Sequence, residues 1–589
     1  ETQGQAPAGN LTIRPELTPD LNIRFTDNGF ISALTTASGQ WGNIDISAPD
    51  LIDIRGQGRI TTETSGIGNA GVITLNSQRL NLQDGIAVSA SSSNSGQGGS
   101  LTITAPDSIR LQRAQLSTQA TGSGEAGDIN LNTAQLELSD NSSLTASSEM
   151  SQGGDLQLRS LETLTINQGE ISASTVDGNA GSLAVNANQS PVNQVTLNQG
   201  SLAVEATGSG NSGNLTVNAR TVNLDNNAEI SASTNSGTGG NITLPQLETL
   251  NINNSAISAS TATGTAGSIA INSAQSVQLQ NQGRITVEAT DGGTAGDITL
   301  NTERLNVTEG SRVSVSSLTG QAGNVTIQTG DLLLDQGAIT AETGKSGVTS
   351  GANINISASN LLTLRLQNES LISATANGFA DGGNIIINTP FLISFPSSGS
   401  NGNDIIAKAF FGDGGRITIN AIGIFGISEG RAIAGNGLSD IDASSEFGAA
   451  GIVQINQALE PNRGLVSLPE NVVDPSDLID QNACRRGKEN RSEFTETGRT
   501  GLPPGVNDNF DGSAPDVDLI EPTKLFQPES SPPPSKPVPI SSATIDPAQG
   551  WRWQEDGTII LVGKAIQTNS PRLPPIPPSC PVSDFSLTP

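Results

Sequence analysis

The residue types that could perform chemistry are few in this chain of 589 residues. It contains no histidine, so it lacks the usual general base, the commonest metal ligand and any Ser-His-Asp triad. Hydrolysis of an acidic polysaccharide would use adjacent carboxylates, but the sequence has no Asp-Asp pair. A lyase would use clustered carboxylates for Ca²⁺ beside a basic side chain, whereas here the carboxylates stand singly. We therefore predict no catalytic residue, no cofactor and no metal site.

Two Asp-Gly motifs and one tryptophan pair have both a structural and a binding interpretation. Calcium-binding nonapeptides repeat in tandem, but the motifs at 380–383 and 412–415 are isolated, so we interpret them as turns. Trp551 and Trp553 alternate with polar residues, which suits a sugar-stacking platform or the anchor of a small hairpin. We favour the hairpin, because an Asp-Gly dipeptide at 556–557 separates two β-prone runs.

The charge and hydropathy of the chain exclude two classes of partner. It has 28 Lys and Arg against 57 Asp and Glu, a formal charge of −29. Such a chain repels phosphate backbones, so we expect no nucleic-acid partner. No apolar run is long enough to span a bilayer, so we expect no transmembrane helix.

The element that must position any functional side chain is an internal repeat of about 29 residues. Each repeat opens with a glycine followed by alternating apolar residues. The marker glycines are Gly42, Gly71, Gly99, Gly127, Gly154, Gly181, Gly213, Gly240, Gly267, Gly296, Gly323, Gly351, Gly383, Gly415 and Gly451. Each glycine suits either a turn with positive φ or a position too crowded for a Cβ atom.

Each repeat contains three short runs of period two, separated by turn residues, and no helical pattern. This predicts an all-β parallel β-helix over residues 41–457, with three strands per coil and about 15 coils. A leucine-rich repeat would show one strand per unit, and a propeller blade would need about 40 residues. Inward positions are Ile and Leu, as in Ile44 and Ile46 or Ile298 and Leu300, and outward positions are mostly polar.

An asparagine closes the first strand of many repeats. We predict that these residues stack from coil to coil as an amide ladder, and the alternative is a row of ligand contacts. The asparagines are Asn76, Asn132, Asn186, Asn218, Asn272, Asn301, Asn388, Asn420 and Asn456.

The remaining segments have different compositions. Residues 1–40 suggest incomplete entry coils, without a cap, so we expect that further coils once preceded Glu1. Residues 458–526 are acidic and irregular, 527–547 form a Pro-rich linker, and 548–589 hold the predicted hairpin and a Pro-rich terminus.

Cys484 and Cys580 are the only cysteines, and both follow the repeat. We predict that they form a disulfide that closes a loop of about a hundred residues, worth up to about 4.7 kcal/mol in the chain-entropy model. We expect the bond to fold the tail toward the end of the rod. The alternative is two unpaired thiols.

Coils of the form G-x-I-T-L-N followed by I-S-A-S-T resemble cyanobacterial exoproteins of the filamentous haemagglutinin type, also called S-layer family proteins. An ordered C-terminal series strengthens the resemblance. Its segments are F-F-G-D-G-G-R-I-T-I-N-A-I-G-I-F-G-I at 410–427, D-A-S-S-E-F-G at 442–448, L-P-E-N-V-V-D-P-S-D-L-I at 468–479, G-R-T-G-L-P-P at 498–504, V-D-L at 517–519 and G-W-R-W-Q-E-D-G-T-I-I-L-V at 550–562.

The resemblance implies a right-handed β-helix secreted by the two-partner route through an outer-membrane β-barrel transporter. The family's N-terminal secretion domain has no match here, which fits the C-terminal portion of a longer protein. We therefore expect a secreted or cell-surface structural rod of a Gram-negative-type, cyanobacterial bacterium. Its expected role is adhesion or matrix contact, with surface glycans or other cells as partners. The alternatives are a pectin lyase-like enzyme acting on polysaccharides and a self-assembling surface-layer component.

Overall fold

The structure is a computed structural model that describes residues 8–26, 28–34, 41–344, 351–360, 364–397, 399–458, 550–553 and 559–562. All of the regular elements that it describes are β-strands. The chain divides into two units, Glu1–Leu465 and Val466–Pro589. The first unit is the predicted β-helix and the second contains the hairpin.

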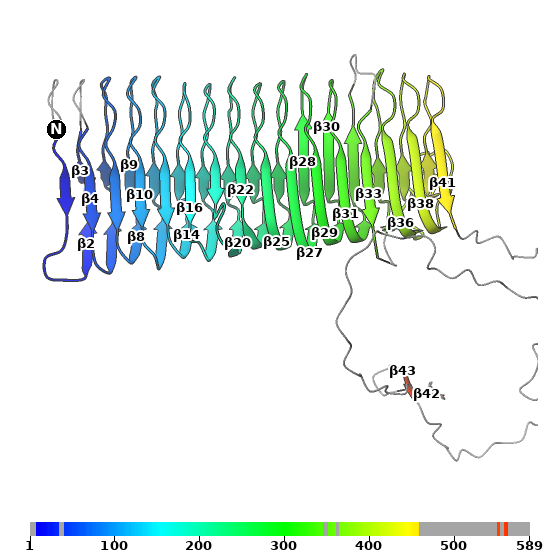
Figure 1. Ribbon diagram of the computed structural model, residues 1–589, viewed down its shortest axis with the longest axis horizontal. Helices are drawn as coiled ribbons and strands as arrows, with labels where there is room; N and C mark the ends of the chain where they lie inside the picture. The colour runs from blue at the N-terminus through cyan, green and yellow to red at the C-terminus, as the bar shows by residue number, and fades with distance from the viewer. Residues whose placement is uncertain are drawn as a thin grey trace, which may run out of the picture. The chain divides into compact units, whose positions relative to one another are not determined.

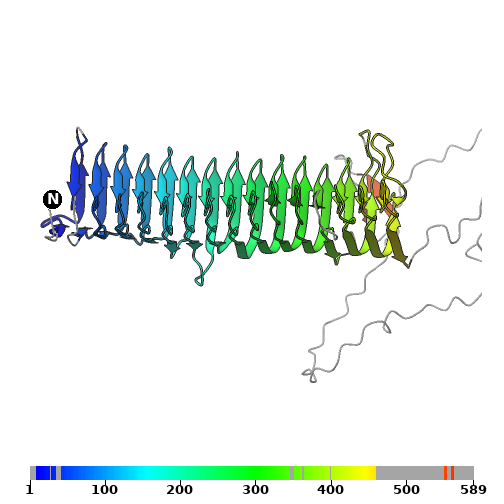
Figure 2. The same ribbon diagram turned by 90° about the horizontal axis from the view of Figure 1, so that it is seen from above.

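The first unit is a stack of about 14 turns, close to the 15 or so expected (Figure 1). In a typical turn, β7 (Ile73–Asn76), β8 (Arg79–Gln83) and β9 (Ala87–Ser89) pair in parallel with the corresponding strands of the next turn. Three strands per turn with parallel pairing between turns confirm the predicted fold class. Figure 2 shows the same stack from above.

The strands of the first unit form two sheets, one of 25 strands and one of 16. The first strands of the turns are β1 (Leu11–Ile13), β4 (Ile44–Ser47), β7, β10 (Leu101–Thr104), β13 (Ile129–Asn132), β16 (Leu156–Arg159), β19 (Leu183–Val185), β22 (Leu215–Val217), β33 (Ile354–Ala358) and β41 (Ile452–Gln457). The second strands are β2 (Asp20–Arg24), β5 (Leu51–Arg55), β8, β11 (Ser108–Gln112), β14 (Gln135–Ser139), β17 (Thr163–Asn167), β20 (Val192–Asn198), β23 (Ala219–Asp225) and β34 (Leu364–Gln367). In other turns the two merge into β25 (Ile242–Asn253), β27 (Ile269–Gln280), β29 (Ile298–Thr308), β31 (Val325–Asp335), β36 (Asn384–Ser394) and β38 (Arg416–Phe425).

The third strands make up the 16-stranded sheet. They are β3 (Phe30–Ser32), β6 (Arg59–Thr61), β9, β12 (Gln115–Ser117), β15 (Ser143–Thr145), β18 (Glu170–Ser172), β21 (Ser201–Ala203), β24 (Glu229–Ser231), β26 (Ala256–Ser258), β28 (Arg284–Ala289), β30 (Arg312–Ser317), β32 (Ala338–Glu342), β35 (Leu371–Ser373), β37 (Asp404–Ile406), β39 (Ser428–Glu429) and β40 (Asp440–Asp442).

The core is a column of Ile, Leu and Val side chains between the sheets. The predicted inward residues Ile44, Ile46, Ile298 and Leu300 are fully buried, whereas Thr299 between the last two is exposed. Because successive side chains in a strand alternate between faces, the period-two pattern sets which face packs inward.

The marker glycines recur because successive turns approach each other too closely for a Cβ atom, and not because the backbone needs a positive φ angle. A Cβ atom on Gly71 would collide with the carbonyl oxygen of Gly42, and one on Gly99 would collide with that of Gly71. Neither glycine has a positive φ angle. Of the two explanations offered by the sequence, the close approach of successive turns is therefore the one that holds.

The β-helix includes residues before position 41. Strands β1, β2 and β3 pair in parallel with β4, β5 and β6, so residues 11–32 supply a turn with all three strands. The hairpin of the second unit also forms, with β42 (Gly550–Trp553) antiparallel to β43 (Ile559–Val562).

Candidate functional site

On the outer side of the 16-stranded sheet, one register position is occupied mostly by Ser and Thr, whose side chains are buried or half-buried, and we call it the hydroxyl row. Its members occupy one register position in successive turns. They are Ser32, Thr61, Ser89, Ser117, Thr145, Ser172, Ala203, Ser231, Ser258, Thr286, Ser314, Thr340, Ser373, Ile406 and Asp442. Each is next to a core residue such as Ile230 or Ile257, so the alternation of the strand directs it outward.

Hydrogen bonds fix this row in place. The hydroxyls of Ser258 and Ser260 lie 2.9 Å apart, and Thr340 Oγ1 donates to Ser314 Oγ at 2.9 Å. Ser231 Oγ donates to Glu205 Oε1 at 2.6 Å. The row is thus connected to the outward residues two positions further along each strand.

Those residues form a second row, the outer row, in which three carboxylates lie between hydroxyls. Its central members are Glu205, Ser233, Ser260, Glu288, Ser316 and Glu342. Glu288, Ser316 and Glu342 are register neighbours on β28, β30 and β32. Neighbouring strands are about 4.8 Å apart, so the backbones of the two glutamates are about 10 Å apart along the rod.

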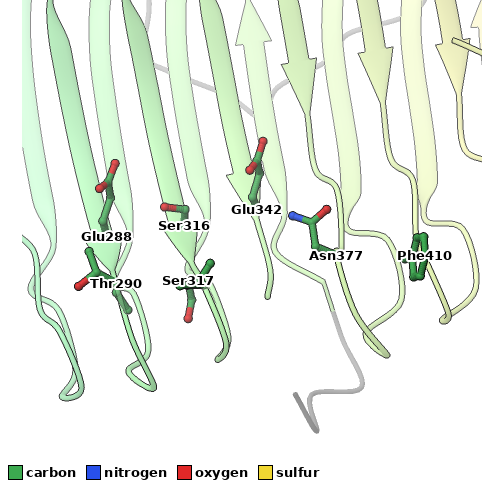
Figure 3. A pocket seen from close by; sticks show the side chains of 9 residues that line it. Glu288, Thr290, Ser316, Ser317, Glu342, Asn377 and Phe410 are labelled. Carbon is green, nitrogen blue, oxygen red and sulfur yellow. The ribbon is translucent and has the colours of Figure 1, made fainter. Parts of the chain in front are cut away.

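Two hollows lie along the outer row. The smaller, of about 350 Å³, is lined by Glu205, Ser233 and Ser260 among others. The larger, of about 710 Å³, is lined by Glu288, Ser316 and Glu342 from three successive turns and by Asn377 and Phe410 from the next two turns (Figure 3). Both hollows include Thr290, so they adjoin.

The two carboxylates of the larger hollow have different environments. Burial raises the pKa of Glu342, and the nearby positive charge of Arg312 partly opposes this effect. Arg312 Nη2 lies 3.9 Å from Glu288 Oε1, so Glu288 is the glutamate that faces the cation directly.

Four phenylalanine rings form an exposed cluster beside the larger hollow. Phe410 contacts Phe411 with ring centroids 4.6 Å apart and Phe447 at 5.2 Å, and Phe379 stacks on Phe411 at 4.9 Å. Phe379 is 67% exposed and Phe447 66%. We call these four residues the aromatic cluster. Sequence reasoning missed it, although the Phe-Phe dipeptide at 410–411 is a visible signal in a chain with 3% aromatic residues.

The predicted asparagine ladder forms at the C-terminal end of the rod. Asn420 Nδ2 donates to Asn388 Oδ1 at 2.7 Å, and Asn456 Nδ2 donates to Asn420 Oδ1 at 2.7 Å. Asn272 and Asn301 are register neighbours on β27 and β29.

The other predicted ladder positions have different neighbours. Asn76 and Asn132 both pair in register with Thr104, which separates them. The buried Asn186 side chain donates to Leu161 O at 2.8 Å, and Asn218 Nδ2 donates to Gln189 O at 2.9 Å. The nine asparagines therefore do not form one continuous ladder, because the intervening turns carry other residue types.

A second ladder, which the sequence analysis missed, follows the marker glycines. Asn43 Oδ1 accepts from Val72 N, Asn214 Oδ1 from Asn241 N, and Asn241 Oδ1 from Ser268 N, at 2.8 to 3.0 Å. The signal is the Asn or Asp directly after many marker glycines. Its side chain bonds the backbone N–H at the same position in the next turn, so its role is structural.

Cys484 and Cys580 lie outside the described residues, as do residues 459–549. Trp551 and Trp553 lie in β42, opposite Leu561 and Ile559 of β43. Within the described residues, no group of three or more His, Cys, Asp or Glu side chains is placed to hold a metal ion. The same residues include no helix long and apolar enough to cross a bilayer.

A comparison with known protein families, with curated proteins and with solved structures found no match for this chain.

Proposed function

We propose that this chain is a secreted or cell-surface structural rod that mediates adhesion or contact with the extracellular matrix. The observation that supports the proposal is the β-helix itself, a stack of about 14 turns whose outward positions recur from turn to turn. The hydroxyl row holds Ser or Thr in every turn from Ser32 to Ser172 and again from Ser231 to Ser373, but these side chains are buried or half-buried, so a partner would meet the half-exposed outer row beside them. A rod whose outward positions recur along its length suits an extended partner, because linked weak contacts bind far more strongly than single ones.

The resemblance of the repeats and of the C-terminal motifs supports the remaining parts of this proposal. They are secretion through an outer-membrane β-barrel transporter and a location on the surface of a cyanobacterial cell. Both cysteines follow residue 458, so the repeat could pass through a transporter unfolded without internal cross-links.

One observation favours an enzyme that acts on polysaccharides as the second candidate. Glu288 and Glu342 line the same hollow from strands about 10 Å apart, and burial raises the pKa of Glu342. Inverting glycosidases place the carboxyl groups of an acid and a base about 6.5–9.5 Å apart in distinct environments, slightly closer together than these two strands. We rank this candidate second because Arg312, rather than a second acid, is the charge nearest to Glu342.

Attachment measurements test the proposed function directly. Beads coated with the purified chain should retain cells and extracellular polysaccharide, whereas beads coated with an unrelated acidic protein of similar charge should not. Equal retention by both coatings would contradict the proposal. Light scattering of the free chain distinguishes an adhesive rod from a self-assembling surface-layer component, because only the second would form large particles without any other partner.

A further inference from the structure

The larger hollow on the outer row is built on a rigid framework. Glu288, Ser316 and Glu342 come from paired strands, and the two lining residues on the next turns are held by backbone hydrogen bonds between turns. Asn377 N donates to Thr343 O at 2.9 Å, and Phe410 N donates to Ala376 O at 3.1 Å. The lining side chains thus come from five successive turns whose backbones are hydrogen-bonded to one another (Figure 3). A framework of this kind can bind a ligand at little cost in ordering entropy.

The polar groups of the hollow define what a ligand must offer. An ionised carboxylate only accepts hydrogen bonds, so Glu288 requires a ligand with donors. The amide of Asn377 and the hydroxyl of Ser316 both donate and accept. A molecule rich in hydroxyl groups satisfies all of these side chains at once.

The aromatic cluster supplies the apolar part of the site. Phe410 lines the hollow and is 42% exposed, and its ring is supported by Phe411 and Phe447. Exposed rings on a polar surface mark interaction sites, because their apolar area gains most when a partner covers it. The C–H face of a pyranose ring is flat and apolar and matches such a ring in size.

We infer that the larger hollow and the aromatic cluster bind a neutral, hydroxyl-rich oligosaccharide. This inference rests on the proposed function and names the chemistry of its partner. The formal charge of −29 and the carboxylates in the hollow disfavour uronic acids and sulfated sugars. The adjoining smaller hollow extends the site along the rod, so the ligand is a chain of several sugar units rather than a monosaccharide.

Titration calorimetry of the full chain tests the inference, with cellohexaose and mannohexaose as neutral probes and trigalacturonate as the acidic one. We expect a neutral probe to bind and the acidic probe not to bind. Phe410→Ala should weaken binding about tenfold, since the stacking surface is lost. The matched control is Phe425→Ala, which removes a ring of similar exposure, 41%, from the other sheet. Its affinity should equal that of the parent.

Glu342→Gln provides a second variant, because it keeps the shape and removes the charge. This variant should also weaken binding of the neutral probe, whereas Glu137→Gln on β14 should leave that binding unchanged. Several outcomes would overturn the inference: no neutral probe binds, the acidic probe binds equally well, or Phe425→Ala weakens binding as much as Phe410→Ala. Competition by a hexalysine peptide would indicate a basic protein partner instead. If the parent chain releases shorter sugars from a probe and Glu342→Gln abolishes this release, the hollow is a site of hydrolysis rather than of binding alone.

The same variants on coated beads separate this inference from the proposed function. If the parent chain retains cells and Phe410→Ala retains them equally, without any sugar binding, the site is wrong and the adhesive role stands. If Phe410→Ala loses oligosaccharide binding but the parent chain retains no cells, the site stands and the adhesive role is wrong.

Discussion

Lys408 Nζ lies 2.9 Å from Asp442 Oδ2, on the next turn of the rod. Lys408 is the only lysine among the residues that the structure describes, and the Asp442 side chain is 3% exposed. Burial alone would raise the pKa of Asp442, but bonds from Lys408, Ser444 and Ala432 together lower it below its ordinary value. The pair therefore joins two C-terminal turns through a carboxylate that is ionised at neutral pH.

Removal of the lysine should destabilise these turns. Lys408→Ala leaves the buried carboxylate with bonds from Ser444 and Ala432 but without a countercharge, and we expect a loss of about 2 kcal/mol, measured by hydrogen exchange at β37 and β40. The double variant Lys408→Ala/Asp442→Asn should lose less than the single one, because no buried charge remains. An equal loss in both would show that the pair contributes only packing. Because the pKa of Asp442 is lowered on folding, this contribution is present above about pH 4 and decreases as the pH falls further.

A second prediction concerns the two faces of β29. Ile298→Asp places an unpaired charge in the core, where it should cost several kcal/mol, whereas Thr299→Asp changes an exposed position and should be nearly neutral. Limited proteolysis should cleave the first variant between 290 and 310 and leave the second intact. Equal resistance of the two variants would mean that the inward and outward faces are reversed.

The sequence predicted the rod because the physical causes of the rod are local. Alternation of Ile, Leu and Val with polar residues sets the strand faces, and the marker glycines set the turn length. The asparagine ladder was only partly predictable, since stacking needs the same residue in adjacent turns. Asn388, Asn420 and Asn456 meet this condition, whereas Thr104 separates Asn76 from Asn132.

The candidate site could not be predicted, because its residues come from five turns and lie at different distances in sequence from the marker glycines. Glu288 follows the marker Gly267, Ser316 follows Gly296, and Glu342 follows Gly323 at three different spacings. Counting from the glycines therefore does not align them, and only the strand pairing shows that they share one row.

The marker glycines make a third prediction. A Cβ atom at position 267 would collide with the backbone carbonyl of Gly240, so Gly267→Ala should destabilise the rod by about 1–3 kcal/mol through forced separation of two turns. Gly292 is the matched control, because a Cβ atom there meets nothing within 4 Å. Chemical denaturation should place Gly292→Ala within about 0.5 kcal/mol of the parent. A neutral Gly267→Ala would contradict crowding as the reason for the glycine repeat.

The last prediction concerns the protonation of Glu342. Burial raises its pKa in the folded chain, so the folded state binds this proton more tightly than the unfolded state does. The proton-linked stabilisation is fully present below the unfolded pKa of about 4.3 and is lost as the pH rises through the folded value. At pH 7 the buried charge therefore destabilises the turn, and Glu342→Gln, which has no charge, should raise the thermal midpoint.

Thermal unfolding of Glu342→Gln and of the parent at pH 4 and pH 7 measures this effect. The difference between the two chains should be clear at pH 7 and should shrink toward pH 4, where both side chains are neutral in most molecules. Glu137→Gln is the control, since Glu137 is exposed and lies 3.4 Å from Arg110 in a surface pair of small net stability. A midpoint that falls at pH 7 in Glu342→Gln would mean that the attraction of Arg312 outweighs the cost of burial.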